Sequence, residues 1–529
     1  MKKFTIITSF CVLLLLVVSG CKKSLDDKYE NPEKAFDGSL SGFLTAILNN
    51  DRVRPSYWNV RTFLLMQPAV YSQTAYYPFS STMYQQNDSY SDQYWNNFYY
   101  ANSNGSGPLS MYRAMQVLYN SMDSATKVTN RIYMEAARVV LYDQASQVVD
   151  MWGDMPFTEA GSLETSSTIV NAKFDSQVDL YKTFLDSLAV AASYFKTAAS
   201  LSAFTRADIL SSGSIDKWQR YANSIRLRLL MRMSNYDETT AQTAIMEMLN
   251  NSAAYPLVDG NNVANYSPGT SDILLKPLTN NINSLKDGLT ELPSHYAPDY
   301  MLNTVMLPAN DPRIPAMFDK YGVTIKDTFY PNATYQAMPI SFNSSQQEAN
   351  YGKYAIWDSA TFLVNAYLPG IVITAPEVNF IKAEAYERWG STASAKAAYD
   401  LAVKQSVSFY YYLNATNTSI AAVTKPSDAV IADFVDNGVA YTGSSANKLS
   451  EIWTQKWLHF GFLQSIQAWA EYRRTGYPQL TFPTATLAGY TTPPTRLVYT
   501  STEKAYNAEN YEVVQPKDLR TNKVFWDVN

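Results

Sequence analysis

Apolar residues recur at helical spacing along most of the chain, most densely in Glu451–Pro478, with the sequence EIWTQKWLHFGFLQSIQAWAEYRRTGYP. Apolar side chains fall on nearly every side of the helix that this stretch predicts. A helix that is apolar all round is buried, so other helices must pack on both sides of it. Gly476 and Pro478 end the stretch after a cationic last turn. We therefore predict that Glu451–Pro478 forms one central helix.

Further stretches follow the 3.6-residue period of an amphipathic helix. They are Pro32–Asn50, Pro55–Val70, Met111–Met122, Leu141–Trp152, Val178–Phe195 and Trp218–Leu229. Pro376–Trp389 and Ala393–Val407 form two more, separated by Gly390-Ser391, and this pair resembles a tetratricopeptide repeat. The pattern predicts a mainly α protein with one large helical domain.

Irregular stretches interrupt this pattern. Tyr71–Tyr100 is dense in aromatic residues, and we expect a loop in its first half and a helix from Ser91. Tyr255–Tyr367 is rich in Asn, Pro, Gly, Ser and Tyr and has only short helical signals. Long irregular segments in compact proteins are usually binding loops or disorder, and the aromatics argue against disorder. We expect this loop-rich half to bind ligand, and the tail Thr481–Asn529 to be turns and short strands.

The N-terminus has the layout of a secretory signal, because Lys2 and Lys3 precede the apolar run Phe4–Val18. The run is too short to span a bilayer comfortably. It ends in Val18-Ser19-Gly20-Cys21, which resembles a bacterial lipoprotein signal. The sequence thus predicts lipidation at Cys21; the alternative is an ordinary cleaved signal in which this cysteine stays unmodified.

These signals divide the chain into three parts. Residues 1–20 are expected to be the lipoprotein signal peptide, residues 21–31 a lipidated polar tether, and residues 32–529 the folded domain. Acyl chains would anchor the protein, since two or more chains hold a protein stably at a membrane. Asp26-Asp27 in the tether resembles the export signals of lipoproteins that face the cell exterior.

Composition excludes several classes of function. The formal net charge of −5 and the pI near 5.3 argue against binding to nucleic acid. The chain has only 2 Cys and 2 His, which excludes a disulfide framework and argues against a Cys/His zinc site. It contains no nucleotide-binding loop, serine-hydrolase elbow or H-E-x-x-H pair. We expect no catalytic residue, cofactor or metal site.

Arginines on apolar helices have two interpretations. They are Arg226, Arg228, Arg232, Arg473 and Arg474. They could clamp an anionic substrate, but arginine in such surroundings is normally paired with a carboxylate such as Glu384 or Glu471. We favour structural ion pairs. His459 is expected in the core, whereas His295 lies in the irregular region, where it could touch a ligand.

Several segments together resemble one family. They are Trp152–Phe157 (WGDMPF), Lys217–Ser234 (KWQRYANSIRLRLLMRMS), Asp311-Pro312-Arg313, Glu377–Glu384 (EVNFIKAE), Gln455-Lys456-Trp457 and Tyr472–Pro478 (YRRTGYP). Their order is similar to that of SusD/RagB-like outer-membrane lipoproteins, in the subgroup with an RRTGYP-type segment. The resemblance runs from Cys21 to Trp526-Asp527, essentially the whole chain.

The resemblance implies that residues 32–529 form a SusD-like nutrient-binding domain, a single large α-helical domain on a tetratricopeptide-repeat-like scaffold whose irregular, loop-rich half holds the ligand surface. It further implies a cell-surface protein that binds a nutrient, usually an oligosaccharide, and is not an enzyme. It also implies a partner, a SusC-like TonB-dependent transporter, which is a plugged barrel in the outer membrane. The signature segments carry the fold, so they transfer no ligand contacts to this chain.

Ligand contacts must therefore be sought in the loops. An aromatic ring can cover the C–H face of a sugar, while amides and charged groups satisfy its hydroxyls. Loop stretches that combine these residue types predict a ligand site formed by Tyr76, Tyr77, Tyr84, Gln85, Asn87, Asn350 and Trp357. The alternative is that each ring pins its loop to the scaffold or faces the transporter.

Two other functions stay open from sequence. One is a lipid-anchored glycan hydrolase, since a glycosidase needs only two carboxylates at a set separation. The other is a helical-repeat scaffold that binds only protein.

Overall fold

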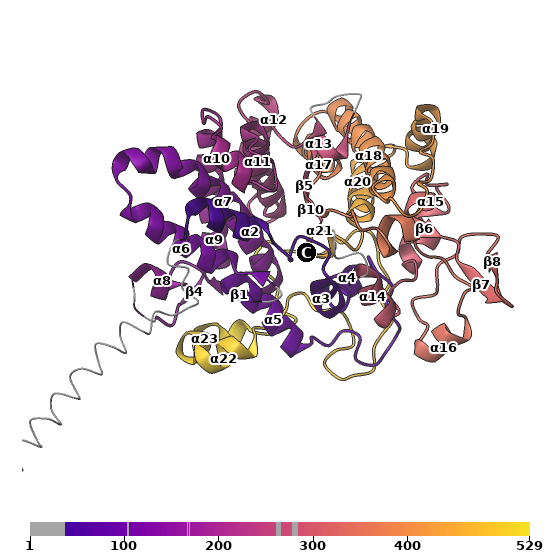
Figure 1. Cartoon of the computed structure of the whole chain (residues 1–529). Helices are drawn as coiled ribbons and strands as arrows, with labels where there is room; N and C mark the ends of the chain where they lie inside the picture. Colours follow the sequence, from indigo (N-terminus) through magenta and orange to yellow (C-terminus); the bar gives the residue numbers. More distant parts are fainter. Residues whose placement is uncertain (1–37, 103–104, 167, 169, 261–265, 278–283) are drawn as a thin grey trace, which may run out of the picture.

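The computed structural model describes residues 38–102, 105–166, 168, 170–260, 266–277 and 284–529. The predicted signal peptide (residues 1–20), the tether (residues 21–31) and Cys21 lie outside these residues. The described chain is mainly helical, as predicted, with short two-stranded β-ladders between the helices (Figure 1).

Long helices dominate the N-terminal part. They are α2 (Leu40–Leu48), α5 (Asp88–Tyr99), α6 (Pro108–Ser121), α7 (Ser124–Trp152), α9 (Gln177–Phe195), α11 (Ile215–Arg232) and α12 (Glu238–Asn250), with the short α8 (Ser162–Ser166) and α10 (Ser202–Ala207) between them. Small ladders pair β1 (Ala101–Asn102) with β2 (Gly105–Ser106) and β3 (Met155–Pro156) with β4 (Phe174–Asp175). This part forms the indigo-to-magenta side of the molecule in Figure 1.

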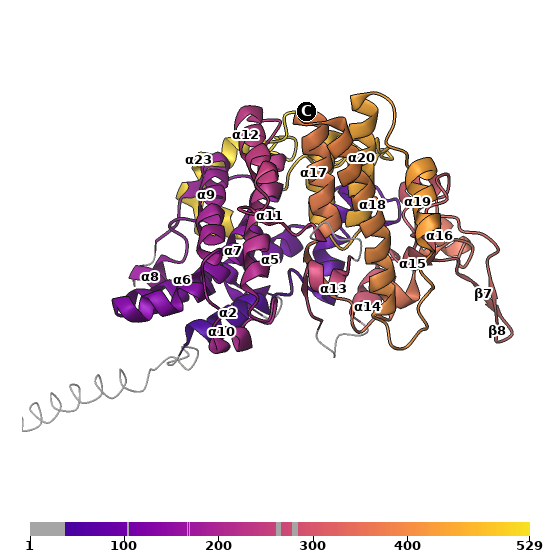
Figure 2. The same cartoon turned by 90° about the horizontal axis from the view of Figure 1, so that it is seen from above.

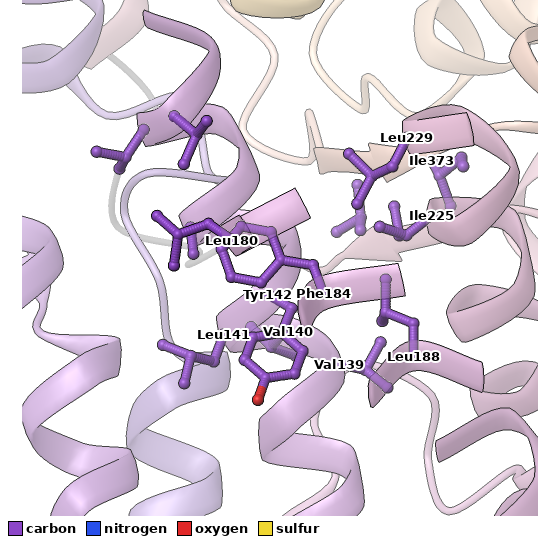
Figure 3. Close-up of a cluster of buried hydrophobic side chains, with 14 of the residues drawn as sticks. Val139, Val140, Leu141, Tyr142, Leu180, Phe184, Leu188, Ile225, Leu229 and Ile373 are labelled. Atoms are coloured by element: carbon purple, nitrogen blue, oxygen red, sulfur yellow. The ribbon is translucent and has the colours of Figure 1, made fainter. Parts of the chain in front are cut away.

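The first of two hydrophobic clusters fills this N-terminal part. Its centre is the contact of α7, α9 and α11, where Leu141, Phe184, Leu188 and Ile225 are at most 1% exposed (Figure 3). Each helix supplies residues at three- and four-residue spacing, which places them on the face toward its neighbours. The periodicity over Val178–Phe195 therefore predicted both this helix and its buried face.

The middle of the chain is irregular, as predicted. Its short elements are α13 (Pro268–Ser271), β5 (Ile273–Leu275), α14 (Ser284–Glu291), η3 (Tyr300–Met306), α15 (Ile314–Met317), β6 (Phe318–Asp319), β7 (Gly322–Ile325), β8 (Thr328–Pro331), α16 (Ser344–Ala349), β9 (Ile356–Trp357), η4 (Ser359–Leu363) and β10 (Gly370–Ile373). The ladders β6–β9, β7–β8 and β10–β5 tie the segments together. The β7–β8 hairpin projects from the edge of the molecule (Figure 2).

Helices return in the last third of the chain. They are α17 (Ala375–Trp389), α18 (Thr392–Ala415), α19 (Asp428–Asp433), η5 (Phe434–Gly438), α20 (Ser445–Phe460), α21 (Ser465–Thr475), α22 (Ser501–Tyr506), α23 (Ala508–Val514) and η6 (Gln515–Lys517). Helices α17 and α18 pack against each other as a hairpin whose turn is Gly390-Ser391, as the resemblance to a tetratricopeptide repeat implies. The predicted short strands of the tail Thr481–Asn529 are wrong, because this segment carries α22, α23 and η6 instead.

The stretch Glu451–Pro478 is buried as predicted, but it is two helices. Gly461 ends α20 with a φ of 51° and a ψ of −157°, a conformation that residues with a side chain rarely adopt. A second hydrophobic cluster lies between α18, α20 and the irregular middle of the chain. A short turn after α20 carries Phe462 into this cluster before α21 begins. The even apolar pattern concealed this break, although the glycine inside it is a known helix-interrupting signal.

A buried network of ions joins the helices of both clusters. Arg474 on α21 lies 2.7 Å from carboxylate oxygens of Glu384 on α17 and of Glu471 on its own helix. Glu471 also accepts from Lys456 on α20 (2.8 Å) and Arg232 on α11 (3.0 Å). Burial alone would raise the pKa of Glu471, but Arg474 and its other cationic neighbours hold it well below the ordinary value. The carboxylate therefore stays charged in the core.

The prediction that the arginines form structural ion pairs is confirmed for Arg228, Arg232 and Arg474. Arg228 pairs with Glu377 at 2.6 Å, and Arg232 pairs with Asp150 at 2.6 Å. Arg473 instead donates to the backbone carbonyls of Asp150 and Thr495. Arg226 lies over the ring of Tyr255, with 5.9 Å between its guanidinium carbon and the ring centroid.

His459 is buried in the core as predicted and makes two side-chain hydrogen bonds. Its Nε2 lies 2.7 Å from Thr374 Oγ1 and its Nδ1 lies 3.0 Å from Ser406 Oγ. Burial, with a contribution from Arg313, lowers the pKa of His459 from 6.5 to about 3. Between these values the unfolded chain binds a proton that the folded chain does not, so stability contributed by the neutral ring is lost as pH falls.

We therefore expect His459→Gln to flatten the acid side of the stability profile. The native protein should lose melting temperature between about pH 6.5 and about pH 4, while the variant, which has no proton to bind at this position, should lose less. Thermal unfolding followed by circular dichroism at a series of pH values measures the difference. Parallel profiles for the two proteins would contradict this account of His459.

Candidate functional site

An aromatic and charged surface forms where four short or terminal helical segments meet. The segments are α3 (Tyr57–Asn59), the π-helical turn η1 (Val60–Leu64), the first turns of α5 and the end of α14, which lie close together in Figure 1. Phe63 of η1 is buried and stacks on Tyr94 of α5, with 3.8 Å between their ring centroids. This packing fixes the outward-facing residues of the same turns.

Trp58 and Tyr90 form the aromatic part of this surface. Both rings are partly exposed, and they meet edge to face with 6.0 Å between their centroids. Trp58 Nε1 donates to Gln93 Oε1 at 2.8 Å, which fixes the indole ring from one edge. A tryptophan whose polar edge is satisfied within the protein keeps its apolar face for another partner.

Arg61 and Glu291 form the charged part. Arg61 Nε lies 2.5 Å from Glu291 Oε2, and Tyr57 donates its hydroxyl to the same oxygen at 2.7 Å. The side chains of Arg61 and Glu291 are 25% and 46% exposed, so the pair faces solvent. The hydrogen bonds from Tyr57 and Arg61 lower the pKa of Glu291, which keeps the carboxylate ionised. We call Tyr57, Trp58, Arg61, Tyr90 and Glu291 the aromatic site.

The chemistry of the aromatic site suits a polyhydroxylated ligand. Indole and phenol rings cover the C–H face of a sugar, and Arg61 and Glu291 can respectively donate to and accept from hydroxyl groups. Charged groups make the stronger hydrogen bonds, so a hydroxyl that bridges the pair would be well satisfied.

Another group of partly exposed aromatics lies around α16 and β7. The hydroxyls of Tyr321 and Tyr351 are 2.5 Å apart, and the Tyr351 side chain is 60% exposed. Phe342 and Tyr354 meet edge to face with 6.2 Å between ring centroids. This group is apolar and phenolic, and it lacks the ion pair of the aromatic site.

The sequence-predicted ligand residues are not brought together. Trp357 is fully buried, with its ring packed against Phe318 (4.9 Å between centroids) and Phe462 (4.8 Å). Tyr76 is 2% exposed and donates to the carbonyl of Phe342, and Tyr84 is 1% exposed and donates to that of Pro483.

A ring without an exposed face cannot stack on a sugar in this conformation. For Tyr76, Tyr84 and Trp357 we therefore correct the predicted ligand contact to the alternative role, in which each ring pins its loop to the scaffold. Sequence could not distinguish these roles, because the same aromatic residues serve both.

The remaining predicted residues lie nearer the surface. Tyr77 is partly buried; burial raises its pKa, and the charge of Arg61 opposes that rise. Gln85 is exposed, and Asn87 caps α5 by accepting the backbone N–H of Tyr90 at 3.1 Å. Asn350 ends α16 and accepts from Lys353 at 3.2 Å. Ligand contact by these four residues stays a prediction.

The sequence pattern did not identify the residues of the aromatic site, because Pro55–Val70 has the periodicity of an ordinary amphipathic helix. One signal was present, since Tyr57 and Arg61 are four residues apart and so share a helix face. The adjacent aromatics Tyr57 and Trp58, close to Arg61 on a short segment, would have indicated a candidate ligand site. The pairing with Glu291, which is 230 residues beyond Arg61, has no local signal.

His295 contacts Tyr296, and burial lowers the pKa of His295 to about 4.

The described residues contain neither a membrane-spanning helix nor a cluster of metal ligands. None of their helices combines the length and apolar character that a membrane span needs. Nor do His, Cys, Asp and Glu side chains gather in these ranges in groups that could hold a metal ion.

Comparison with known proteins places the chain in a family. Residues 40–500 match the model of the SusD-like_2 family, described as starch-binding and associating with the outer membrane. The chain therefore belongs to the SusD-like family, as its sequence resemblance implied. No curated protein sequence is significantly similar to it.

Solved structures share the fold. A chitin-binding protein superposes with a TM-score of 0.72 at 23% identity, covering 93% of this chain and 100% of its own. A SusD homologue from Bacteroides uniformis gives 0.70 at 19% identity, with coverage of 93% and 100%. A chitin-binding SusD homologue from Flavobacterium johnsoniae gives 0.69 at 20% identity, with coverage of 93% and 99%. These similarities confirm the predicted SusD-like helical architecture.

Proposed function

We propose that this protein is a cell-surface binding lipoprotein that captures an oligosaccharide and delivers it to a SusC-like TonB-dependent transporter. The single observation that carries the proposal is the aromatic site, where the partly exposed Trp58 and Tyr90 rings lie beside the solvent-facing Arg61–Glu291 pair. Membership of a family described as starch-binding and associating with the outer membrane supports both the ligand class and the location.

Binding requires no bond to break. The rings would hold a sugar face and the ion pair would orient its hydroxyls, so affinity would come from contacts in a largely preformed site. Release would follow when the transporter accepts the ligand.

Calorimetric titration of the purified protein with a panel of oligosaccharides tests the proposal. Chito-oligosaccharides and malto-oligosaccharides come first, because solved relatives bind chitin and the family is described as starch-binding. Saturable binding without products by chromatography is expected. Product formation would favour a hydrolase that uses Glu291 and Asp287, which lies one turn earlier on α14. The absence of all saccharide binding would favour a protein-binding scaffold.

Membrane attachment has its own test at Cys21. We expect Cys21→Ser to move the protein from the membrane fraction to the soluble fraction, because serine lacks the thiol that is acylated and the anchor depends on acyl chains. Cys11→Ser, in the apolar signal run, is the matched control and should leave the protein membrane-bound. Fractionation followed by immunoblotting measures both, and membrane retention of the Cys21 variant would contradict lipidation there.

A further inference from the structure

A groove of about 630 Å³, whose lining shares no residue with the aromatic site, lies between α2, the turn that precedes α11 and the end of β5. Its lining includes Asn49, Arg54, Ser212 and Lys276. Every charged residue in the lining is a cation, and no acidic side chain is among the described residues that line it. The composition of the groove therefore favours an anionic ligand.

Arg54 is the central residue of this groove. Its side chain is buried, with 6% of the residue exposed, and its Nε donates to the carbonyl of Lys276 at 2.8 Å. Its Nη1 donates to Asn49 Oδ1, whereas its Nη2 has no hydrogen-bond partner among the described residues. Burial lowers the pKa of Arg54, and only the more distant Asp51 opposes this effect.

No carboxylate in the described part of the chain forms an ion pair with Arg54. Arg228, Arg232 and Arg474 in the core differ, since each contacts carboxylates directly. Arg473 resembles Arg54, because it donates to backbone carbonyls. A buried charge is costly unless it is paired, and a guanidinium with a free N–H edge is suited to a carboxylate. The groove thus holds a buried cation that no described carboxylate contacts directly, and Asp51 acts on it only at longer range.

Other donors surround the same space. Lys276 is exposed and forms no ion pair with a described carboxylate. The side-chain oxygen of Asn49 accepts a hydrogen bond from Arg54, which leaves the amide N–H groups of Asn49 for a ligand. Ala46, Ile209 and Pro277 provide a short apolar wall. This wall suits the C–H face of a sugar ring.

We propose that this groove is a second binding site, which takes a carboxylate-bearing saccharide with its carboxylate on Arg54 and Lys276. The site is separate from the aromatic site and shares no residue with it. A uronic acid unit would pair the buried guanidinium, satisfy the free N–H groups and place its ring against Pro277. The ligand of the whole protein would then include an acidic sugar, either in the captured chain or as a separate small ligand.

Titration with trigalacturonate tests the site, with its methyl-esterified form as a neutral probe of the same shape. The native protein should bind the acid and bind the ester at least about tenfold more weakly, since charge-assisted hydrogen bonds are lost. Lys276→Glu should weaken binding of the acid at least about tenfold. Lys276 is exposed, so this variant should fold. Lys326→Glu makes the same charge change at an exposed residue of the β7–β8 turn, on the side of the molecule away from α2 (Figure 2), and should bind normally.

Several outcomes would overturn the second site. They are no binding of trigalacturonate, equal binding of acid and ester, or equal losses in the two lysine variants. Loss of binding in Trp58→Ala with retention in Lys276→Glu would assign the acid to the aromatic site. Binding only to phosphatidylglycerol vesicles, weakened by Lys276→Glu, would replace the saccharide with a lipid headgroup. Neutral oligosaccharide binding is measured separately, so failure here leaves the aromatic site untouched.

Discussion

Trp58→Ala is expected to weaken oligosaccharide binding by about tenfold to a hundredfold, because burying a large apolar side chain contributes roughly 1.5–3 kcal/mol. The indole is partly exposed and its edge is fixed by Gln93, so its removal deletes a ligand surface and little of the core. Isothermal titration calorimetry of the variant measures the change in Kd. Its melting temperature should stay close to that of the native protein.

Two aromatic controls sharpen this result. Tyr506→Ala removes a ring that is 79% exposed on α22 and should leave affinity unchanged. Tyr351→Ala removes the most exposed ring of the group around α16 and β7. If Tyr351→Ala abolishes binding while Trp58→Ala does not, the ligand lies on that other group and the aromatic site is wrong.

Arg474→Met is expected to lower the free energy of unfolding by about 3–5 kcal/mol, because it leaves buried carboxylates without their partner. Glu384 and Glu471 are both buried, and both lie 2.7 Å from the guanidinium. Urea unfolding followed by tryptophan fluorescence measures the loss. Since the network joins α11, α17, α20 and α21, the whole domain should unfold at lower denaturant.

A surface ion pair is the matched control for this prediction. Lys396 and Asp400 lie 2.6 Å apart on α18, but both are partly exposed. Lys396→Met should cost at most about 1 kcal/mol, the usual range for an exposed pair. Equal destabilisation by the two variants would contradict a special role of the buried network.

Much of the helical scaffold was predictable, because the buried residues of a helix recur every three or four positions along the sequence. The pattern over Val178–Phe195 marked α9 and its buried face, and Gly390-Ser391 marked the turn between α17 and α18. The buried pairing of Arg474 with Glu384 and Glu471 also followed, because a charge on an apolar helix needs a partner. These inferences rest on spacing and on the cost of burying unpaired charge.

The ligand site was less predictable because it joins residues that are distant in sequence. Glu291 reaches Arg61 only through the packing of α14 on α3 and η1. Trp357 was chosen for its loop-rich surroundings, yet β6–β9 pairing carries it into the core. Composition shows that a loop is aromatic, but only the fold determines which rings face solvent.

A crystal structure of the protein with the oligosaccharide that binds best in the panel tests the central claim most directly. We expect a sugar ring stacked on Trp58 or Tyr90, with hydroxyl groups hydrogen-bonded to Arg61 and Glu291. A sugar bound elsewhere, with the aromatic site unoccupied, would contradict this claim.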